Sequence, residues 1–218
     1  MLISRYIGTK EIEMTKIKEL IARWNSDEGK PYKGTLIDYA AYKPGELGCM
    51  CAQGQVLHVV AGWSIDDLRS TSQAKADLAT AKALNISRAH AVLLRDINDS
   101  ADGAPSSVLT DPGKVLGDQW SKLLDFWHYM DGMDSAGWKK VAPARDAARA
   151  AAGDAAWDAA WAAVVSAGAG AAAWDAAWEI QGASILAAQC RALFFLPMFG
   201  FASLDAIPAR PADYGVVA

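Results

Sequence analysis

One histidine lies among carboxylates in a pattern that could carry acid–base chemistry. His128 follows Asp125 by three residues and precedes Asp131 by three. A histidine oriented by an acid can act as a general base, but the same spacing is also an ordinary surface pair on a helix. The sequence contains no nucleophile elbow and no complete phosphate-binding loop beside it. We therefore assign no catalytic residue, and hydrolysis by His128 and its neighbouring acids is the third of three hypotheses.

Two cysteines and a second histidine have the chemistry of metal ligands. Cys49 and Cys51 are separated by one residue, and His58 follows seven residues later. Structural zinc sites use thiolate and imidazole ligands and normally need four of them. The third cysteine, Cys190, lies far along the chain with no histidine near it. We therefore expect ordinary buried thiols, no bound metal and no cofactor.

Residues 73–97 have the pattern of a helix-turn-helix DNA-binding unit. Ala81 is a small residue where two helices would cross, and Asn85 can take the left-handed conformation of the turn. Residues 72–97 are slightly basic, as phosphate contact requires. Two capped helices joined by a tight turn also occur in many folds that never bind DNA. The side chains that would contact DNA are Ser87, Arg88, His90 and Arg95.

The most conspicuous segment is an alanine- and tryptophan-rich tract at residues 142–190. The phrase Asp-Ala-Ala-Trp occurs three times within it. Alanine is the strongest helix former, so the tract should be helical. A repeat of four residues advances a side chain by about 40° around a helix, so the tryptophans share a drifting face. Glycines at 168 and 170 interrupt the repeat, which predicts two close-packed helices joined by a turn or a kink.

The tract tryptophans and the helix around His128 supply the candidate ligand-binding residues. Tryptophan offers a large apolar surface that can line a pocket or fill the contact between two helices. The sequence leaves both alternatives open. The candidates are Trp127, His128, Asp131, Trp157, Trp161, Trp174 and Trp178.

The elements that must position these residues fall into two regions. We expect residues 1–62 to form a small α+β module, with a helix at 14–24 and strands at 35–42 and 55–60. We expect residues 63–218 to form a helical domain that includes the tract. Its clearest helices are predicted at 73–84, 88–97 and 118–130, with Ser64 and Asp67 forming a capping box and Ser72 a second cap. The fold class is therefore mainly α with a small N-terminal α+β module and Ala/Trp-rich helices packed in the C-terminal half.

Composition excludes several classes of protein. The 218 residues are 52% hydrophobic and 21% charged with a net charge of −4, as in globular proteins rather than disordered or strongly nucleic-acid-like ones. The N-terminus lacks the apolar core of a signal peptide. The most apolar stretch, residues 183–201, is interrupted by Gln189, Arg191 and Pro197, which a membrane span would not normally tolerate. We expect a cytoplasmic protein with no membrane partner.

Five segments give the chain a resemblance to a known group of sequences. They are GCMCAQGQVLH at 48–58, ISRAHAVLLR at 86–95, VLGDQW at 115–120, WDAAWEIQG at 174–182 and FLPMFGF at 195–201. With these segments the chain resembles a family of uncharacterised proteins of actinobacteriophages, mainly of the mycobacteriophage type. The resemblance spans nearly the whole chain but carries no activity to transfer. It implies a phage or prophage origin, the cytoplasm of a bacterial host as the location, and a role against the host or its defences.

Three functions follow, in order of preference. The first is a non-catalytic binding protein that engages a host protein or a small ligand such as a signalling nucleotide. The second is a DNA-binding protein that uses residues 73–97, and the third is the small hydrolase built on His128. Each is compatible with a homo-oligomer.

Overall fold

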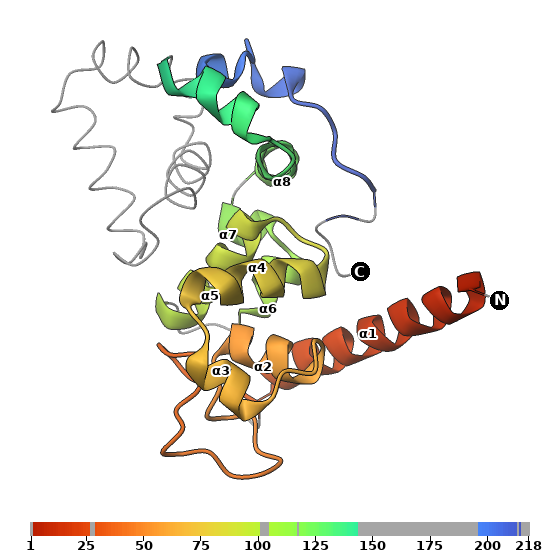
Figure 1. The fold of residues 1–218 in the computed structure, drawn as a ribbon, viewed down its shortest axis with the longest axis vertical. Coiled ribbons are helices and arrows are strands. Elements are labelled where there is room, and N and C mark those ends of the chain that lie inside the picture. Colours follow the sequence, from red (N-terminus) through yellow and green to blue (C-terminus); the bar gives the residue numbers. More distant parts are fainter. Residues whose placement is uncertain are drawn as a thin grey trace, which may run out of the picture. The chain divides into compact units, whose positions relative to one another are not determined.

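The computed structural model describes residues 2–26, 29–100, 105–116, 118–143, 196–212 and 214. The chain divides into two compact units. Unit 1 comprises residues 1–86, 90–111 and 215–218, and unit 2 comprises residues 87–89 and 112–214. The boundary expected at Gly62 falls inside unit 1 and stays a prediction. The described ranges are mainly helical, as expected, and contain no β-strand (Figure 1).

Unit 1 is built around one short buried helix. Its helices are α1 (Leu2–Trp24), α2 (Ala52–Val59), α3 (Ile65–Ser70), α4 (Gln73–Leu84), most of α5 (Arg88–Ser100) and α6 (Ser106–Thr110). Helix α2 contacts α1, α3 and α4, and all of its residues from 52 to 57 are buried. The helix predicted at 14–24 lies within α1, which begins earlier, at Leu2, and its apolar residues Ile17, Leu20, Ile21 and Trp24 are buried. Burial of one stripe per helix is what amphipathic spacing predicts.

The strand predicted at residues 55–60 is wrong, because residues 55–59 belong to α2 and Val60 is its C-cap. A short apolar run bounded by glycines does not distinguish a buried strand from a buried helix. Two features of the sequence favour the helix. The Cys51 side chain caps it by accepting a hydrogen bond from the Gly54 amide at 3.4 Å. The Gln55 side chain accepts from Trp24 Nε1 at 2.9 Å and donates to the carbonyls of Leu47 and Met50, so its amide is paired inside the core.

The strand predicted at residues 35–42 is also not formed. One antiparallel bridge pairs Ile37 with Met50. Two hydrogen bonds form it: the Asp38 amide donates to the Cys49 carbonyl at 2.7 Å, and the Cys51 amide donates to the Leu36 carbonyl at 3.3 Å. Residues 39–41 then form a turn instead of continuing the ladder. The described part of residues 1–62 is thus helix and loop, and the α+β module expected there is not seen.

A buried polar network joins α2, α4 and α5. Asp77 on α4 is fully buried and accepts hydrogen bonds from Gln53, Gln73 and Arg95, with Arg95 Nη1 at 2.9 and 3.0 Å from its two oxygens. The Gln53 amide also donates to the Ala91 carbonyl at 2.9 Å. Buried charges are stable only when they are paired and hydrogen-bonded in this way. The network fixes α4, which carries one wall of the pocket described below.

Unit 2 contains a helix of twelve residues and a C-terminal segment that packs on it. Its elements are α7 (Gly113–Leu116), α8 (Trp120–Asp131), a further helix at residues 135–143, and the short 3₁₀ helices η3 (Leu196–Phe199) and η4 (Leu204–Ala206). Phe126 of α8 meets Phe199 edge-on, with ring centroids 5.0 Å apart. Arg210, in the irregular tail, forms an ion pair with Asp125 of α8 at 2.6 Å.

The Ala/Trp tract lies almost wholly outside the described residues, which resume at Leu196. The two packed helices predicted for it therefore stay a prediction. Among the helices that the structure describes, none is both long and apolar enough to span a membrane.

Candidate functional site

Helix α8 carries three of the candidate ligand-binding residues, Trp127, His128 and Asp131. Two of them, His128 and Asp131, both contact Tyr214 within unit 2. The His128 ring stacks edge-on against Tyr214 at a centroid distance of 4.4 Å. Asp131 accepts hydrogen bonds from the backbone amide of Arg88 at 2.9 Å and from the Tyr214 hydroxyl at 3.4 Å. Trp127 is only 2% exposed, so its ring belongs to the interior. Asp125, the acid that could have oriented His128, pairs with Arg210 instead.

The other four candidate ligand-binding residues are Trp157, Trp161, Trp174 and Trp178. They lie outside the described residues. Whether they line a pocket or pack on one another stays a prediction.

The candidate DNA-binding residues lie on a helix pair of the expected shape. Helices α4 and α5 are joined by Asn85 in the left-handed conformation, with φ 52°. However, Ser87 and His90 are each 1% exposed, and His90 Nε2 donates to the Val108 carbonyl at 2.6 Å. The Arg95 side chain, 11% exposed, is held by Asp77. DNA contact through these three side chains would require them to leave the interior.

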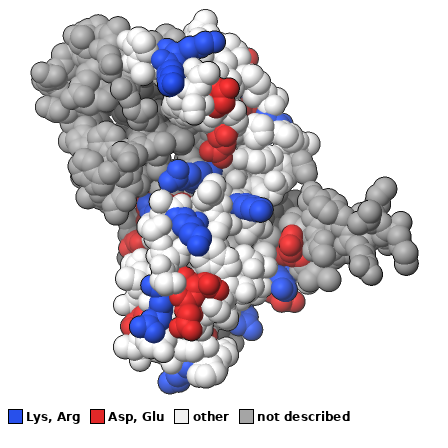
Figure 2. Space-filling model, in the orientation of Figure 1, with Lys and Arg blue, Asp and Glu red and all other residues white. Residues whose placement is uncertain are grey.

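The fourth DNA candidate is Arg88, whose backbone amide binds Asp131. On the face drawn in Figure 2, acidic side chains lie beside the basic ones over the described residues. A DNA-binding surface normally gathers basic side chains on one face. The described geometry thus has the shape of the motif, but three of its four candidate side chains are buried or held by another residue.

The cysteine cluster has structural roles. Burial raises the pKa of the Cys51 thiol to about 11, and this thiol caps α2. Burial also raises the pKa of Cys49. His58 Nδ1 donates to the Trp63 carbonyl at 2.7 Å. No three potential metal ligands converge within the part of the chain that the structure describes.

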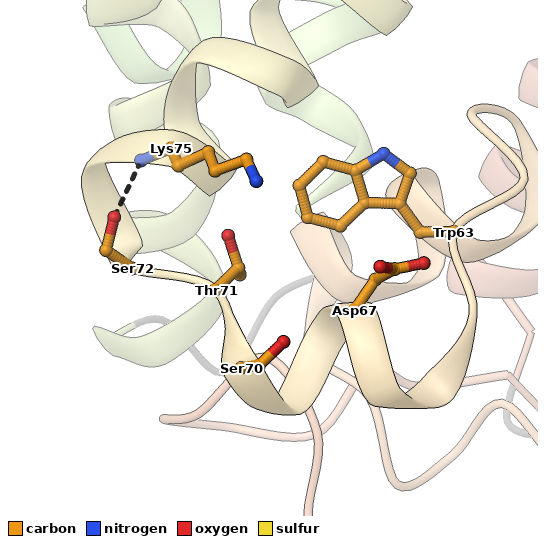
Figure 3. A pocket seen from close by; sticks show the side chains of 6 residues that line it. All are labelled: Trp63, Asp67, Ser70, Thr71, Ser72 and Lys75. Carbon is orange, nitrogen blue, oxygen red and sulfur yellow. Dashed lines mark hydrogen bonds between the residues drawn. The ribbon is translucent and has the colours of Figure 1, made fainter.

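A pocket between α3 and α4 is the strongest candidate site in unit 1. Its volume is about 540 Å³. Figure 3 shows an indole ring and an ammonium group pointing toward one another across it, with three hydroxyl side chains and one carboxylate around them. The lining residues are Trp63, Asp67, Ser70, Thr71, Ser72 and Lys75.

Two helix caps build this pocket. The Ser64 amide and hydroxyl both donate to Asp67 Oδ2, at 3.0 and 2.7 Å, and the Asp67 amide donates back to Ser64 Oγ at 3.1 Å. This reciprocal capping box starts α3, as the sequence predicted. Ser72 caps α4 by accepting a hydrogen bond from the Lys75 amide. The caps are local, so they fix the backbone on both sides of the pocket.

The indole of Trp63 forms the aromatic wall. Its residue is anchored by backbone contacts, with its amide donating to the Leu57 carbonyl at 2.9 Å and its carbonyl accepting from His58. The side chain is half-buried, and part of it packs on the core cluster around Leu57 and Leu68. Lys75 Nζ lies 5.8 Å from the ring centroid, within cation–π range. Trp63 is therefore a fixed surface against which a ligand can rest.

Charge within the pocket is divided between its two sides. Hydrogen bonds from the Ser64 hydroxyl and amide lower the pKa of Asp67, so this carboxylate is ionised at neutral pH. Lys75, on the other helix, carries the positive charge. Between them the Thr71 hydroxyl oxygen is buried and has no hydrogen-bond partner among the described residues. An unpaired buried hydroxyl is uncommon in native proteins and needs an explanation.

The sequence indicated the caps of this pocket but not the pocket itself. Ser64, Asp67 and Ser72 were identified as capping residues. Trp63 and Lys75 are twelve residues apart and meet only because the chain turns between α3 and α4. No periodicity connects them, so the sequence carries no direct signal for their contact.

Comparisons with known proteins add no further constraint. No protein-family model, no curated protein and no solved structure matches this chain.

Proposed function

We propose that this chain is a non-catalytic binding protein that takes a small ligand in the pocket between α3 and α4. The convergence of Trp63 and Lys75 across a cavity of about 540 Å³ is the observation that supports this proposal. Small-molecule sites are concave, with an aromatic surface and a few polar groups that fix orientation. This volume is within the range of such sites, about 300–1,000 Å³. A concave site of this size favours a small ligand over a host protein as the partner.

The lining residues support binding rather than catalysis. The pocket has three hydroxyl side chains as candidate nucleophiles, Ser70, Thr71 and Ser72, but no histidine among its six lining residues. A serine or threonine nucleophile needs an adjacent base to accept its proton. One oxygen of the Asp67 carboxylate, Oδ2, already accepts two hydrogen bonds from Ser64 in the capping box. The pocket therefore holds donors and acceptors without the pair that acyl or phosphoryl transfer requires.

The biological setting of the proposal comes from the resemblance to actinobacteriophage proteins. A phage protein that binds a small host metabolite or a signalling nucleotide can act in the cytoplasm of the host and counter its defences. The pocket supports the ligand-binding part of this proposal, and a nucleotide is the first class to test.

Native mass spectrometry of the full chain, purified from actinobacterial cells, tests the proposal. We expect a bound small molecule with the wild-type protein and its loss in Trp63→Leu, because leucine keeps apolar contact with the core but removes the aromatic wall. Leu78→Ala is the matched control, because Leu78 lies on α4 outside the pocket and is 61% exposed. It should leave the ligand in place. Absence of any bound small molecule from the wild-type protein, or a ligand retained in full by Trp63→Leu, would contradict the proposal.

A further inference from the structure

We infer that the ligand is a nucleoside monophosphate, a molecule with one planar ring, one anionic group and hydroxyl donors. This inference rests on the proposed function and names the chemistry that each side of the same pocket recognises. Three observations carry it: the indole of Trp63, the ammonium and hydroxyl groups around Lys75, and the carboxylate of Asp67.

The aromatic wall selects a planar ring. Trp63 is held by two backbone hydrogen bonds and turns its ring toward the cavity (Figure 3). A nucleobase stacks on tryptophan with little dependence on which base it is. The ring is the largest apolar surface among the six lining residues, so a ligand without a planar or apolar part would leave it uncovered.

The α4 side of the pocket selects an anion. Lys75 supplies a cation, and Thr71 supplies a hydroxyl donor on the same side of the pocket (Figure 3). Ser72 Oγ accepts from the Lys75 amide and so fixes the backbone that carries Lys75. In Figure 3 the Thr71 hydroxyl points toward the space between Lys75 and Trp63, and it is a buried group with no hydrogen-bond partner in the described residues. A phosphate oxygen at this position would accept from the Thr71 hydroxyl and the Lys75 ammonium.

The α3 side of the pocket selects a donor and disfavours a second anion. Asp67 lies beside Trp63 and stays ionised, because Ser64 holds its pKa low. Its oxygen Oδ2 receives both bonds from Ser64, which leaves Oδ1 to accept from a ligand. Ribose hydroxyl groups are such donors, whereas a further phosphate here would meet a like charge. One phosphate and a ribose therefore match the two sides better than a chain of phosphates.

Isothermal titration calorimetry of the full chain at low, fixed salt tests this inference. The probes are the monophosphates of adenosine, guanosine, cytidine and uridine, the four matching nucleosides, and inorganic phosphate. We expect at least one monophosphate to bind about ten-fold or more tightly than its nucleoside, as a charge-assisted hydrogen bond would give. Lys75→Gln should reduce this monophosphate to the affinity of its nucleoside, while the affinity for the nucleoside stays the same.

A matched variant and the choice of probes separate the outcomes. Lys82→Gln removes a similar exposed charge from the C-terminal end of α4 and should change neither affinity. Equal binding of nucleoside and monophosphate would overturn the phosphate assignment, and phosphate binding as tightly as any monophosphate would overturn the ring assignment. If no probe binds while native mass spectrometry still finds a ligand that depends on Trp63, the inference fails and the proposed function stands.

Discussion

At the scale of single residues, Asp96 shows opposing effects on one buried carboxyl group. Its side chain is 9% exposed and accepts a hydrogen bond from Arg95 Nε at 3.2 Å. Burial raises the pKa of Asp96 to about 6, even though the Arg95 charge acts in the opposite direction. The Arg95 guanidinium is also bound by both oxygens of Asp77, so its charge is shared between two acids. Desolvation therefore outweighs the ion pair at Asp96.

This pKa predicts how stability depends on pH. An unfolded aspartate has a pKa of about 3.9, so the ionised form of Asp96 is disfavoured in the folded state. The protonated carboxyl of Asp96 therefore makes its whole contribution to stability below about pH 4, and this contribution is lost as the pH rises through about 6. Between these limits we expect the free energy of unfolding to fall, relative to Asp96→Asn, by up to about 3 kcal/mol. Urea unfolding of the wild type and of Asp96→Asn from pH 4 to 7 measures this difference in the free energy of unfolding. Parallel pH profiles of the two proteins would refute the prediction.

Residue roles that depend on local backbone geometry could be predicted from the sequence. Ser64 with Asp67, Ser72 and Asn85 all act as expected, because a cap or a left-handed turn involves residues three or four positions apart. The role of Trp63 could not be predicted in this way, because its partner Lys75 lies in the first turn of α4, beyond the intervening helix α3. Contacts across a loop depend on the path of the chain, which local preferences do not determine.

At the scale of elements, the packing of α2 depends on a glycine. A Cβ atom at position 54 would collide with the backbone carbonyl oxygen of Leu36, which cannot move away as a flexible side chain could. Gly54→Ala should therefore lower the free energy of unfolding by about 1–3 kcal/mol. Helix propensity alone predicts the opposite sign, since alanine is favoured over glycine by about 1 kcal/mol within a helix.

Chemical denaturation of the purified full chain distinguishes these two predictions. Gly48→Ala serves as the control, because nothing lies within 4 Å of a Cβ atom at Gly48. We expect this control to stay within about 0.5 kcal/mol of the wild type, as most surface substitutions do. A stabilised Gly54→Ala protein would mean that α2 does not approach Leu36 as closely as described.

The same helix explains where sequence reasoning failed. Residues 55–60 combine an apolar run with bounding glycines, and the period of so short a run is ambiguous. The information that decides between strand and helix is the pairing of Gln53 and Gln55 with distant groups, Asp77 on α4 and Trp24 on α1. By contrast, α4 and α8 each have an apolar pattern twelve residues long, and the sequence predicts both within two residues of their observed bounds.

At the scale of the whole chain, the most visible sequence feature and the candidate site belong to different parts of the sequence. The Ala/Trp tract drew attention because it repeats, whereas the pocket is made of six residues without a repeat. The helical class followed from composition and periodicity, which are properties of the chain as a whole. The pocket required the turn between α3 and α4, so only the fold could reveal it.

Unit 2 depends on a contact between residues 85 positions apart in the chain, Arg210 and Asp125. Arg210 Nη1 lies 2.6 Å from Asp125 Oδ1 and also donates to the Ser121 carbonyl at 2.8 Å, and the two ion-pair side chains are 12% and 8% exposed. Breaking one partner of a buried pair leaves the other charge uncompensated, so Arg210→Ala should destabilise unit 2 by about 3 kcal/mol. Lys122→Ala is the control, because Lys122 Nζ is 4.0 Å from the same carboxylate but 36% exposed, and its loss should cost less than about 1 kcal/mol.

A double-mutant cycle with Asp125→Ala then separates the pair from its surroundings. Removing both partners leaves no uncompensated charge, so the double variant should be more stable than the sum of the two single losses predicts. Hydrogen exchange of the α8 amides reports whether the loss is felt at the helix that Arg210 binds. Strictly additive losses, or α8 amides as protected in Arg210→Ala as in the wild type, would show that the tail at residues 207–214 does not hold α8. A coupling of about 1–3 kcal/mol would show that the C-terminal segment is part of the folded core of unit 2.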